Sequence, residues 1–485
     1  MKRDCAALAL LVSCLGLSGS AAADEPLGSA ASRRLDEDQN RPNILFFITD
    51  DESWLERSVY GWSSLPTPHM DRVARDGVLF THAYTSAPSC APSRAVCVTG
   101  RNFWELNQGA FIQAWLPREF PVLPDLLAAA GYHVGYTGKG WGPGVYPEGA
   151  HKYPTGPAYN SLKLKQEDRI RHISAIDYAA NFADFLQKRE KGQPFWFWMG
   201  TTEPHGPYDN ENYLRLEKEF GVRLEDVSVP GFLDDTPDVR RQRANFLYEC
   251  CYADRQLGKA LKLLDDCGEL ENTLVFVTSD NGSAAGEFGK ATPYEWSCRE
   301  PLAVMWPKRV PKGRTVTDFV SFRDFAPTIL DAAGLKAPAS MSGSTLLPIL
   351  CSDQSGRVDP ERNFIVHGLE WHGEFEPASR SHRTFRNDRF AYIVRYGNSL
   401  PPGDAMTPDA EIAGEELYDM EKDPWQRNNL VGNPESTEIL AELKAGLRKY
   451  ALETGDPRFT GKMKVFRETR SFVQERKRRG YEKSK

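Results

Sequence analysis

A cysteine near the start of the segment SCAPSRAVCVTGR, residues 89–101, stands where it could take part in catalysis. Pro92 and Ser93 suit the first turn of a helix, and Arg94 lies four residues after Cys90. One helical turn would bring the Arg94 side chain close to the Cys90 thiol, beside backbone N–H groups that lack partners within the helix. The pattern therefore predicts an anion-binding site next to a thiol.

Two other interpretations of Cys90 remain open from the residues alone. A phosphatase that uses a thiolate nucleophile needs the spacing C-x5-R, but Val96 occupies the arginine position of that spacing. A buried structural cysteine is the second alternative, and it is the one that we expect for Cys97. Cys90 and Cys97 would lie two helical turns apart, on the order of 10 Å, which is too far for a disulfide bond.

Further polar residues follow four apolar stretches that are typical of buried strands. The stretches and the residues after them are 43–49 with Asp50 and Asp51, 132–138 with Lys139, 194–200 with His205, and 273–279 with Asp280 and Asn281. In a sheet of parallel strands, ligands bind beyond the carboxyl ends of the strands. We therefore expect these side chains to meet at one edge of the sheet.

The two acidic pairs at this edge offer only oxygen ligands. Asp50, Asp51, Asp280 and Asn281 suit a hard cation such as Ca²⁺ or Mg²⁺, whereas zinc would recruit more His or Cys ligands. A helix cap or a turn is the alternative for either pair taken alone. Two such pairs at the ends of two buried strands favour a metal site.

The elements that would position these residues alternate between strands and helices. Segments 123–131 and 246–268 read as helices that end at glycine, and they alternate with the strands above. This order predicts an α/β fold with a mostly parallel sheet covered by helices on both faces. After about residue 350, short strands and a helix around 435–454 predict a smaller α+β domain. We place the catalytic domain at 41–355 and the smaller domain, with an antiparallel sheet and a helix, at 356–485.

Composition limits the class of partner. Of the 485 residues, 40% are hydrophobic and 26% are charged, and the formal net charge is −7. This balance is typical of a globular protein and does not favour a nucleic-acid partner, although a local anion pocket remains compatible with it. The last twenty residues are basic, and we expect them to form a solvated tail.

The N-terminus has the pattern of an export signal. A charged end, an apolar run and a small-residue cleavage site predict a signal peptide over 1–23, followed by a flexible lead-in over 24–40. No other segment reads as a membrane span. We expect the mature protein to be periplasmic or secreted, and Cys14 is a poor match to a lipidation site. Seven cysteines follow the predicted signal, and the sequence leaves their pairing open.

The segment CAPSRAVCVTGR resembles the signature of the formylglycine-dependent sulfatases, C-x-P-S-R-x-x-x-x-T-G-R. The resemblance extends over residues 41–460 and includes PNILFFITDD, GYHVGYTGK, EPHGPY and NTLVFVTSDNG. It implies an alkaline-phosphatase-like fold and a hydrolase of sulfated sugars. It also implies a formylglycine-generating enzyme as the partner that oxidises the cysteine to an aldehyde.

The resemblance implies a role for each matching residue. Cys90 would become the formylglycine, whose hydrate supplies the nucleophile. The remaining roles are a calcium site made by Asp50, Asp51, Asp280 and Asn281 together with the modified Cys90, contacts to the hydrate and sulfate from Arg94 and Lys139, and contacts to the sulfate and leaving group from His205 and Lys290. Trp141 departs from the family pattern, because the family usually has a histidine two residues after the lysine that corresponds to Lys139.

Several stretches resemble the heparan N-sulfatases most, including GEFGKATPYEW and YALETGDPRF. That resemblance implies terminal N-sulfoglucosamine of heparan or heparin fragments as the substrate, with Glu370 and His372 as substrate contacts. A solvated loop after a strand is the alternative for both residues. For the whole chain, the alternatives are an O-sulfatase on another glycan, a phosphonate-ester hydrolase, and a non-catalytic glycan-binding protein on a sulfatase scaffold.

Overall fold

The computed structural model describes residues 41–373, 381–397 and 412–483 of the chain. The predicted signal peptide, residues 1–23, and the predicted lead-in, residues 24–40, lie outside these described residues. Among the helices that the structure describes, each is too short or too polar to cross a membrane.

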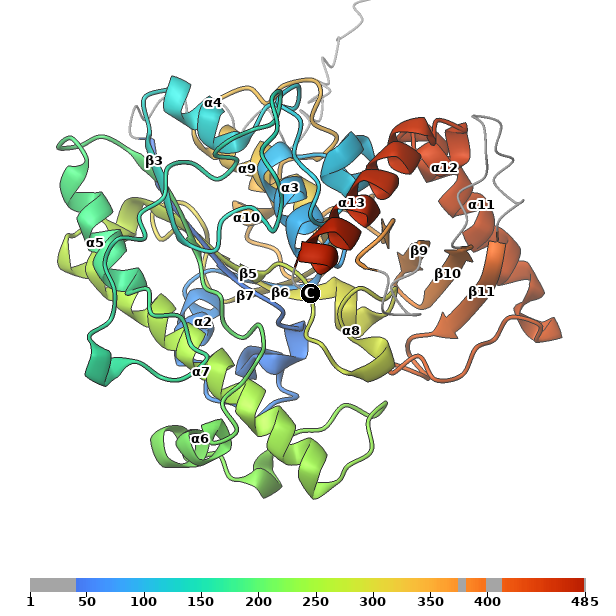
Figure 1. Ribbon diagram of the computed structural model, residues 1–485, viewed down its shortest axis with the longest axis horizontal. Coiled ribbons are helices and arrows are strands. Elements are labelled where there is room, and N and C mark those ends of the chain that lie inside the picture. Colours follow the sequence, from blue (N-terminus) through green and yellow to red (C-terminus); the bar gives the residue numbers. More distant parts are fainter. Residues whose placement is uncertain (1–40, 374–380, 398–411, 484–485) are drawn as a thin grey trace, which may run out of the picture.

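A seven-stranded sheet forms the centre of the molecule, with strand order β3-β4-β1-β5-β6-β2-β7 (Figure 1). The strands are β1 (Asn43–Thr49), β2 (Val78–Tyr84), β3 (His133–Gly138), β4 (Phe195–Gly200), β5 (Thr273–Ser279), β6 (Arg299–Met305) and β7 (Arg314–Ser321). Neighbouring strands run parallel, except that β6 is antiparallel to both β5 and β2. The mostly parallel sheet predicted from the sequence is confirmed.

Helices cover both faces of the sheet. The side chains of β1 alternate between the two hydrophobic cores that lie on these faces. Ile44 and Phe46 belong to one core, and Leu45 and Phe47 belong to the other. The first core includes side chains of α3 (Cys90–Thr99), α4 (Leu123–Ala129), α9 (Phe325–Ala332) and the short α10 (Leu347–Leu350), and the second includes side chains of α2 (Pro68–Arg75), α5 (Tyr178–Lys188), α6 (Asn212–Phe220) and α7 (Pro237–Asp266). Burial on both faces explains why β1 reads as a continuous apolar run.

Helix α7 is longer than the sequence predicts. It begins at Pro237 rather than near residue 246, and the Thr236 hydroxyl caps it by accepting a hydrogen bond from the Val239 N–H. The first turns read PDVRRQRAN, which is too polar to show the apolar periodicity by which helices are recognised. These polar turns border the pocket described below.

A second, four-stranded antiparallel sheet has the order β11-β10-β9-β8. Its elements and the helices after it are β8 (Phe364–Leu369), β9 (His382–Asn387), β10 (Phe390–Tyr396), β11 (Ile412–Asp419), α11 (Thr437–Glu453), α12 (Pro457–Thr460) and α13 (Lys464–Lys483). Helix α11 packs against β9 and β10. Val366 and Tyr392 belong to the same hydrophobic core as Ile44, so this smaller sheet shares a core with the central one.

The prediction of a solvated tail is wrong. The last described residues form helix α13, which returns to the catalytic domain. The Phe466 ring packs edge-to-face on Phe111 and the Phe472 ring packs likewise on Trp115, and Phe466 and Val473 are fully buried. Apolar residues spaced along a strongly basic stretch therefore anchor the helix, while its charged side chains remain outside.

Candidate active site and metal centre

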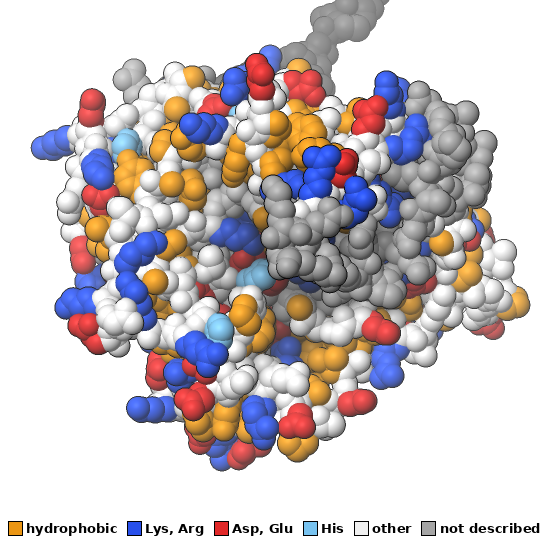
Figure 2. Space-filling view, viewed as in Figure 1, with side chains coloured by type: hydrophobic (Ala, Val, Ile, Leu, Met, Phe, Trp, Pro, Cys, Tyr) orange, Lys and Arg blue, Asp and Glu red, His pale blue; other side chains and the backbone are white. Residues whose placement is uncertain are grey.

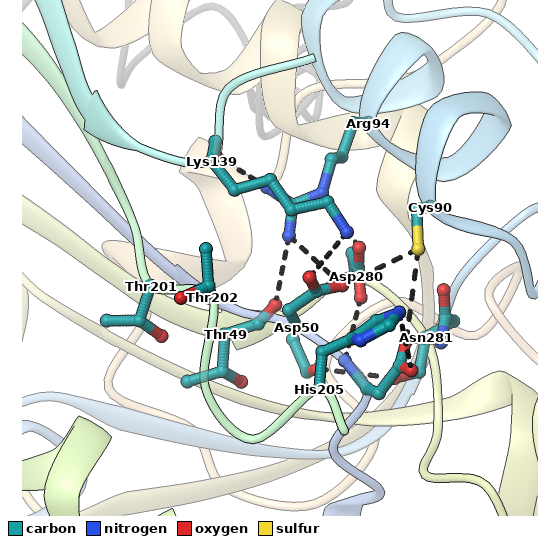
Figure 3. A network of polar contacts seen from close by, with 12 residues as sticks. Thr49, Asp50, Cys90, Arg94, Lys139, Thr201, Thr202, His205, Asp280 and Asn281 are labelled. Atoms are coloured by element: carbon teal, nitrogen blue, oxygen red, sulfur yellow. Dashed lines mark hydrogen bonds and ion pairs between the residues drawn. The ribbon is translucent and has the colours of Figure 1, made fainter. Parts of the chain in front are cut away.

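The order of the central strands brings the predicted site residues together. β1 lies between β4 and β5, and β3 pairs with β4, so the carboxyl ends of these four parallel strands meet at one edge. Helix α3 begins at Cys90 above this edge. Figure 3 shows the Cys90 and Arg94 side chains pointing towards Asp50 and Asp280, with Lys139 and His205 on either side.

A group of four buried side chains could hold a metal ion. Ligand atoms of Asp50, Asp51, Cys90 and Asp280 all lie within 4.8 Å of one another. Asn281 donates a 2.8 Å hydrogen bond through Nδ2 to Asp51, while its buried Oδ1 has no hydrogen-bond partner. Such a carbonyl oxygen beside three carboxylates fits a hard cation, which prefers oxygen ligands. The donor set therefore suits the predicted calcium or magnesium ion.

The Cys90 thiol lies among charged groups but remains neutral. Its Sγ atom is 3.0 Å from Lys290 Nζ and 3.5 Å from Asp50 Oδ1. Burial raises the pKa of Cys90 to about 12, although the charges of Lys139 and Lys290 oppose this. A thiol with this pKa is a poor nucleophile at neutral pH, which counts against the thiolate-phosphatase alternative. Cys97 is also buried, as predicted for a structural cysteine.

The two carboxylates after β1 are ionised at neutral pH. Burial raises the pKa of Asp50, but the positive charges of Lys139 and Arg94 outweigh it and hold that pKa below its usual value. Burial likewise raises the pKa of Asp51, but Lys290 and His205 lower it further than burial raises it. Lys139 contacts Asp50 directly, and Lys290 Nζ lies 2.5 Å from Asp51 Oδ1.

The Arg94 guanidinium is buried, and its N–H groups donate hydrogen bonds to other residues of the protein. Its Nε donates a 2.7 Å hydrogen bond to Asp280, and its Nη1 donates a 2.8 Å hydrogen bond to the Lys139 carbonyl. Burial alone would lower the pKa of Arg94, but Asp280 and Asp50 raise it. Arg94 therefore positions a metal ligand and the end of β3, in addition to any contact with substrate.

His205 is the most exposed of the predicted catalytic residues. Its side chain is 45% exposed, and its Nε2 lies 3.7 Å from Asp51 Oδ2. The Nδ1 atom lies 2.7 Å from the Gly206 carbonyl oxygen. Because a carbonyl can only accept a hydrogen bond, we assign the Nδ1 proton to this contact. The Nε2 atom is then the one that can exchange a proton at the site.

His372 and Glu370 were both predicted to contact substrate, and the structure places them in different surroundings. The His372 Nδ1 lies 2.9 Å from the Ser89 hydroxyl, directly before Cys90. Burial, followed by the charge of Lys290, lowers the pKa of His372 to about 4, so its imidazole is neutral. The sequence analysis missed Ser89, although a serine before the first turn of a helix is a recognisable signal.

Glu370 lies in a buried ion-pair cluster rather than in the solvated loop considered from sequence. Its two carboxylate oxygens accept hydrogen bonds of 2.7 and 2.9 Å from Arg383 and Arg458, and its exposed fraction is 2%. Burial raises the pKa of Glu370, but Arg458 and Arg383 lower it below its usual value. These contacts give Glu370 a structural role between β9 and α12.

Trp141 occupies the place where the resemblance leads us to expect a histidine. Its indole is buried, packs edge-to-face on Tyr146, and has an Nε1 atom without a hydrogen-bond partner among the described residues. An indole can donate a hydrogen bond but cannot accept a proton. Trp141 therefore cannot perform the proton transfer that the resemblance assigns to a histidine at this position.

A buried glutamate within electrostatic range of the carboxylates Asp280 and Asp51 was also missed. Glu300 comes from β6, the antiparallel strand, and is 1% exposed. Burial, reinforced by the charges of Asp280 and Asp51, raises its pKa well above the usual value, so it stays protonated. No local sequence signal predicts this position of Glu300, because the position depends on β6 lying next to β5.

Comparisons with known proteins agree with this geometry. Residues 42–335 match the family described as Sulfatase, and residues 284–453 match the family described as N-sulphoglucosamine sulphohydrolase, C-terminal. The human N-sulphoglucosamine sulphohydrolase is 28% identical over an alignment of 475 positions, which covers 86% of this chain and 91% of that protein. The N-acetylglucosamine-6-O-sulfatase of Bacteroides thetaiotaomicron is 26% identical over an alignment of 497 positions, which covers 84% of this chain and 86% of that protein.

Solved structures share the fold. A protein in complex with its substrate D-glucosamine-2-N,6-O-disulfate aligns with a TM-score of 0.66 at 24% identity, covering 86% of this chain and 99% of that chain. A phosphonate monoester hydrolase from Silicibacter pomeroyi aligns with a TM-score of 0.61 at 19% identity, covering 86% and 96%. These likenesses confirm the predicted fold. Because the first family match covers more than half of the sequence, this chain belongs to the sulfatase family of hydrolases.

Proposed function

We propose that this protein removes the sulfate group from a sulfated glucosamine unit, with terminal N-sulfoglucosamine of heparan or heparin fragments as the favoured substrate. The observation that carries the proposal is the neutral Cys90 thiol at the start of α3, enclosed by carboxylates and by the Lys290 ammonium. The match of residues 284–453 to the C-terminal domain of N-sulphoglucosamine sulphohydrolase supports the choice of substrate.

We propose that Cys90 is oxidised to formylglycine by a formylglycine-generating enzyme before the protein is active. In its hydrated form this group would supply a hydroxyl nucleophile for sulfur, and a calcium ion held by Asp50, Asp51, Asp280 and Asn281 would supply Lewis acidity. The four donor residues fit that ion because their oxygen atoms converge, and because Asn281 Oδ1 has no other partner within the described residues.

The side chains of this chain have separable roles in the proposed reaction. Burial lowers the pKa of Lys290, but the Asp51 carboxylate raises it well above the usual value, so the group stays cationic. Burial likewise lowers the pKa of Lys139, but the Asp50 carboxylate raises it above the usual value. Both ammonium groups can therefore bind the sulfate oxygens and offset the charge that develops on them.

Two imidazoles can serve the proton transfers that Trp141 cannot. His205 presents Nε2 to the centre, and its exposed position suits protonation of a departing amine or alcohol. His372 lies against Ser89, on the side of Cys90 where α3 begins. We propose that His205 protonates the leaving group. We propose that His372 assists the proton transfers at the group formed from Cys90.

We also propose that the protein acts outside the cytoplasm, as the N-terminal sequence pattern indicates. The seven cysteines among the described residues are all free thiols, so no disulfide bears on this point. The proposed location rests on residues 1–23 alone, and N-terminal sequencing of protein recovered from the periplasm or medium would test it.

An O-sulfatase is the second candidate, and the 26% identity to the N-acetylglucosamine-6-O-sulfatase of Bacteroides thetaiotaomicron favours it. The test compares kcat/KM for glucosamine N-sulfate, N-acetylglucosamine 6-O-sulfate and a phosphonate monoester, all with matured enzyme. A preference for the N-sulfate supports the favoured substrate. A preference for the 6-O-sulfate replaces it with the second candidate, and turnover of the phosphonate alone would contradict both.

A further inference from the structure

A pocket of about 360 Å³ adjoins the metal centre, large enough for a small ligand. Its wall combines the loop after His205, the first turns of α7 and the segment after Asn281. The lining residues used in the argument are Tyr208, Asn210, Gln242, Arg243, Phe246 and Ser283. Figure 2 shows the visible face with acidic and basic side chains interspersed, and with a hollow near the middle of the view.

Two of the pocket's lining residues connect it to the proposed reaction centre. Ser283 follows the metal ligand Asn281 by two residues, and its carbonyl accepts a 3.1 Å hydrogen bond from the Lys290 N–H. On the opposite wall, burial and then the charge of Asp51 raise the pKa of the Tyr208 phenol, while Lys290 lowers it. Tyr208 therefore lies within electrostatic range of the groups that surround Cys90.

The pocket offers no net charge to a ligand. Arg243 is the one charged side chain among its lining residues, and the Glu56 carboxylate neutralises it through contacts of 2.9 and 3.4 Å. The Arg243 Nε donates a 2.7 Å hydrogen bond to the Ser228 carbonyl, and the guanidinium lies over the Trp296 ring. A second anionic group bound here would lose its hydration without gaining an unpaired cation.

The remaining wall suits hydroxyl groups. Asn210 and Gln242 are exposed at the pocket, and each amide can both donate and accept hydrogen bonds, as a hydroxyl group requires. Tyr208 and Phe246 pack edge-to-face and provide apolar ring surface. A sugar ring has this combination of hydroxyl groups and apolar C–H faces.

We propose that this pocket binds the sugar ring that carries the sulfate, and that it selects a ring whose other substituents are uncharged hydroxyl groups. The inference rests on the proposed sulfatase function. It adds that the enzyme acts on singly sulfated rings in preference to doubly sulfated ones, because Gln242 and Asn210 offer amides where a second sulfate would need a cation.

Charge introduced at Gln242 tests the proposal. The experiment compares kcat/KM for glucosamine N-sulfate and glucosamine N,6-O-disulfate, using matured wild-type enzyme, Gln242→Lys and Gln242→Met. We expect the wild type to prefer the singly sulfated ring by about tenfold or more. Gln242→Lys should raise the relative rate on the disulfate by about tenfold, because its ammonium can pair with the second sulfate. Gln242→Met should slow both sugars and leave their ratio unchanged.

An activated aryl sulfate serves as the probe of the reaction centre, because it has no sugar ring. Its turnover should fall far less than that of the sugars in Gln242→Met, and it should stay within about twofold in the control Arg241→Gln, whose side chain contacts Asp238 and Tyr213 instead of the pocket. An unchanged sugar ratio in Gln242→Lys, or equal loss on the aryl sulfate, overturns the inference. Wild-type enzyme that releases sulfate from none of the three substrates overturns the proposed function itself.

Discussion

The Lys290 ammonium donates a hydrogen bond of 3.0 Å to the Cys90 sulfur and lies 2.5 Å from Asp51. A lysine beside a cysteine usually lowers the thiol pKa and creates a reactive thiolate. Here burial has the larger effect, and the pKa of Cys90 stays at about 12. The site therefore holds a neutral thiol among ionised groups, which fits a cysteine that is a precursor rather than a nucleophile.

Unmodified Cys90 should resist alkylation at neutral pH. Because its pKa is raised to about 12, the thiolate fraction at pH 8 is on the order of one in ten thousand and grows tenfold with each pH unit. The exposed Cys267 is the internal control. Iodoacetamide labelling followed by peptide mass spectrometry should show Cys267 modified first at pH 8. Equal labelling rates of the two thiols would contradict the assigned pKa and the burial of Cys90.

Removal of one carboxylate should abolish metal binding. Asp280→Asn keeps the side-chain shape but removes a charge that faces both the cluster and Arg94. We expect Ca²⁺ at 100 times its Kd to stabilise the wild type by about 2.7 kcal/mol and the variant hardly at all. Calorimetric unfolding with and without Ca²⁺ measures this. Asp266→Asn, which breaks an exposed pair with Lys262, should respond to calcium as the wild type does. Equal stabilisation of all three proteins by Ca²⁺ would show that the ion binds at a site that does not include Asp280.

Substitution of Glu370 can distinguish a structural role of this residue from a role in substrate binding. Glu370→Gln would remove the carboxylate charge that Arg383 and Arg458 share in this buried cluster, and we expect a loss of about 3–5 kcal/mol of unfolding free energy. Glu475→Gln, which breaks an exposed pair with Arg479, should cost no more than about 0.5 kcal/mol. Urea unfolding measures both. A changed KM with unchanged stability would restore Glu370 as a substrate contact.

The same residue gives a pH dependence of known sign. The pKa of Glu370 is below its usual value in the folded protein, so its contribution to stability is fully present above the unfolded pKa of about 4.3. The contribution is lost as the pH falls through the folded pKa. The stability difference between the wild type and Glu370→Gln should therefore shrink below about pH 4. A difference that grows with acid would have the wrong sign for a paired carboxylate.

Strands that carry their own signal were predictable from sequence. β1 and β5 match the apolar runs 43–49 and 273–279, because a strand that is buried on both faces has a continuous apolar sequence. The first turns of α7 and the whole of α13 were not predictable in this way. The first turns of α7 show no apolar stripe, and the few apolar residues of α13 stand within a strongly basic stretch. The position of α13 depends on contacts with residues far away in the sequence, such as Phe466 on Phe111.

The site shows the same division. Asp50, Lys139 and Asp280 could be placed together because parallel strands end at one edge. Glu300 could not be placed with them, because its proximity to Asp280 depends on β6 running antiparallel beside β5. The ion pairs of Glu370 likewise depend on Arg458, which lies 88 residues away in the sequence.

His205 should matter most where the leaving group needs a proton. His205→Ala should slow hydrolysis of glucosamine N-sulfate by about 10²–10⁴-fold, because an amine must be protonated as it departs. An activated aryl sulfate leaves without a proton and should lose far less. Because the His205 side chain is 45% exposed, the fold should survive the change. Equal losses on both substrates, measured as kcat, would remove His205 from the role of proton donor.

Conversion of Cys90 is the most direct test of the proposed function. Preparations made with and without a formylglycine-generating enzyme should contain different fractions of aldehyde at this residue, which mass spectrometry of the Cys90 peptide quantifies. We predict that sulfate release from glucosamine N-sulfate rises in proportion to that fraction, and that Cys90→Ala loses at least about 10³-fold in kcat. Full activity in a preparation whose Cys90 is entirely an unmodified thiol would contradict the proposal.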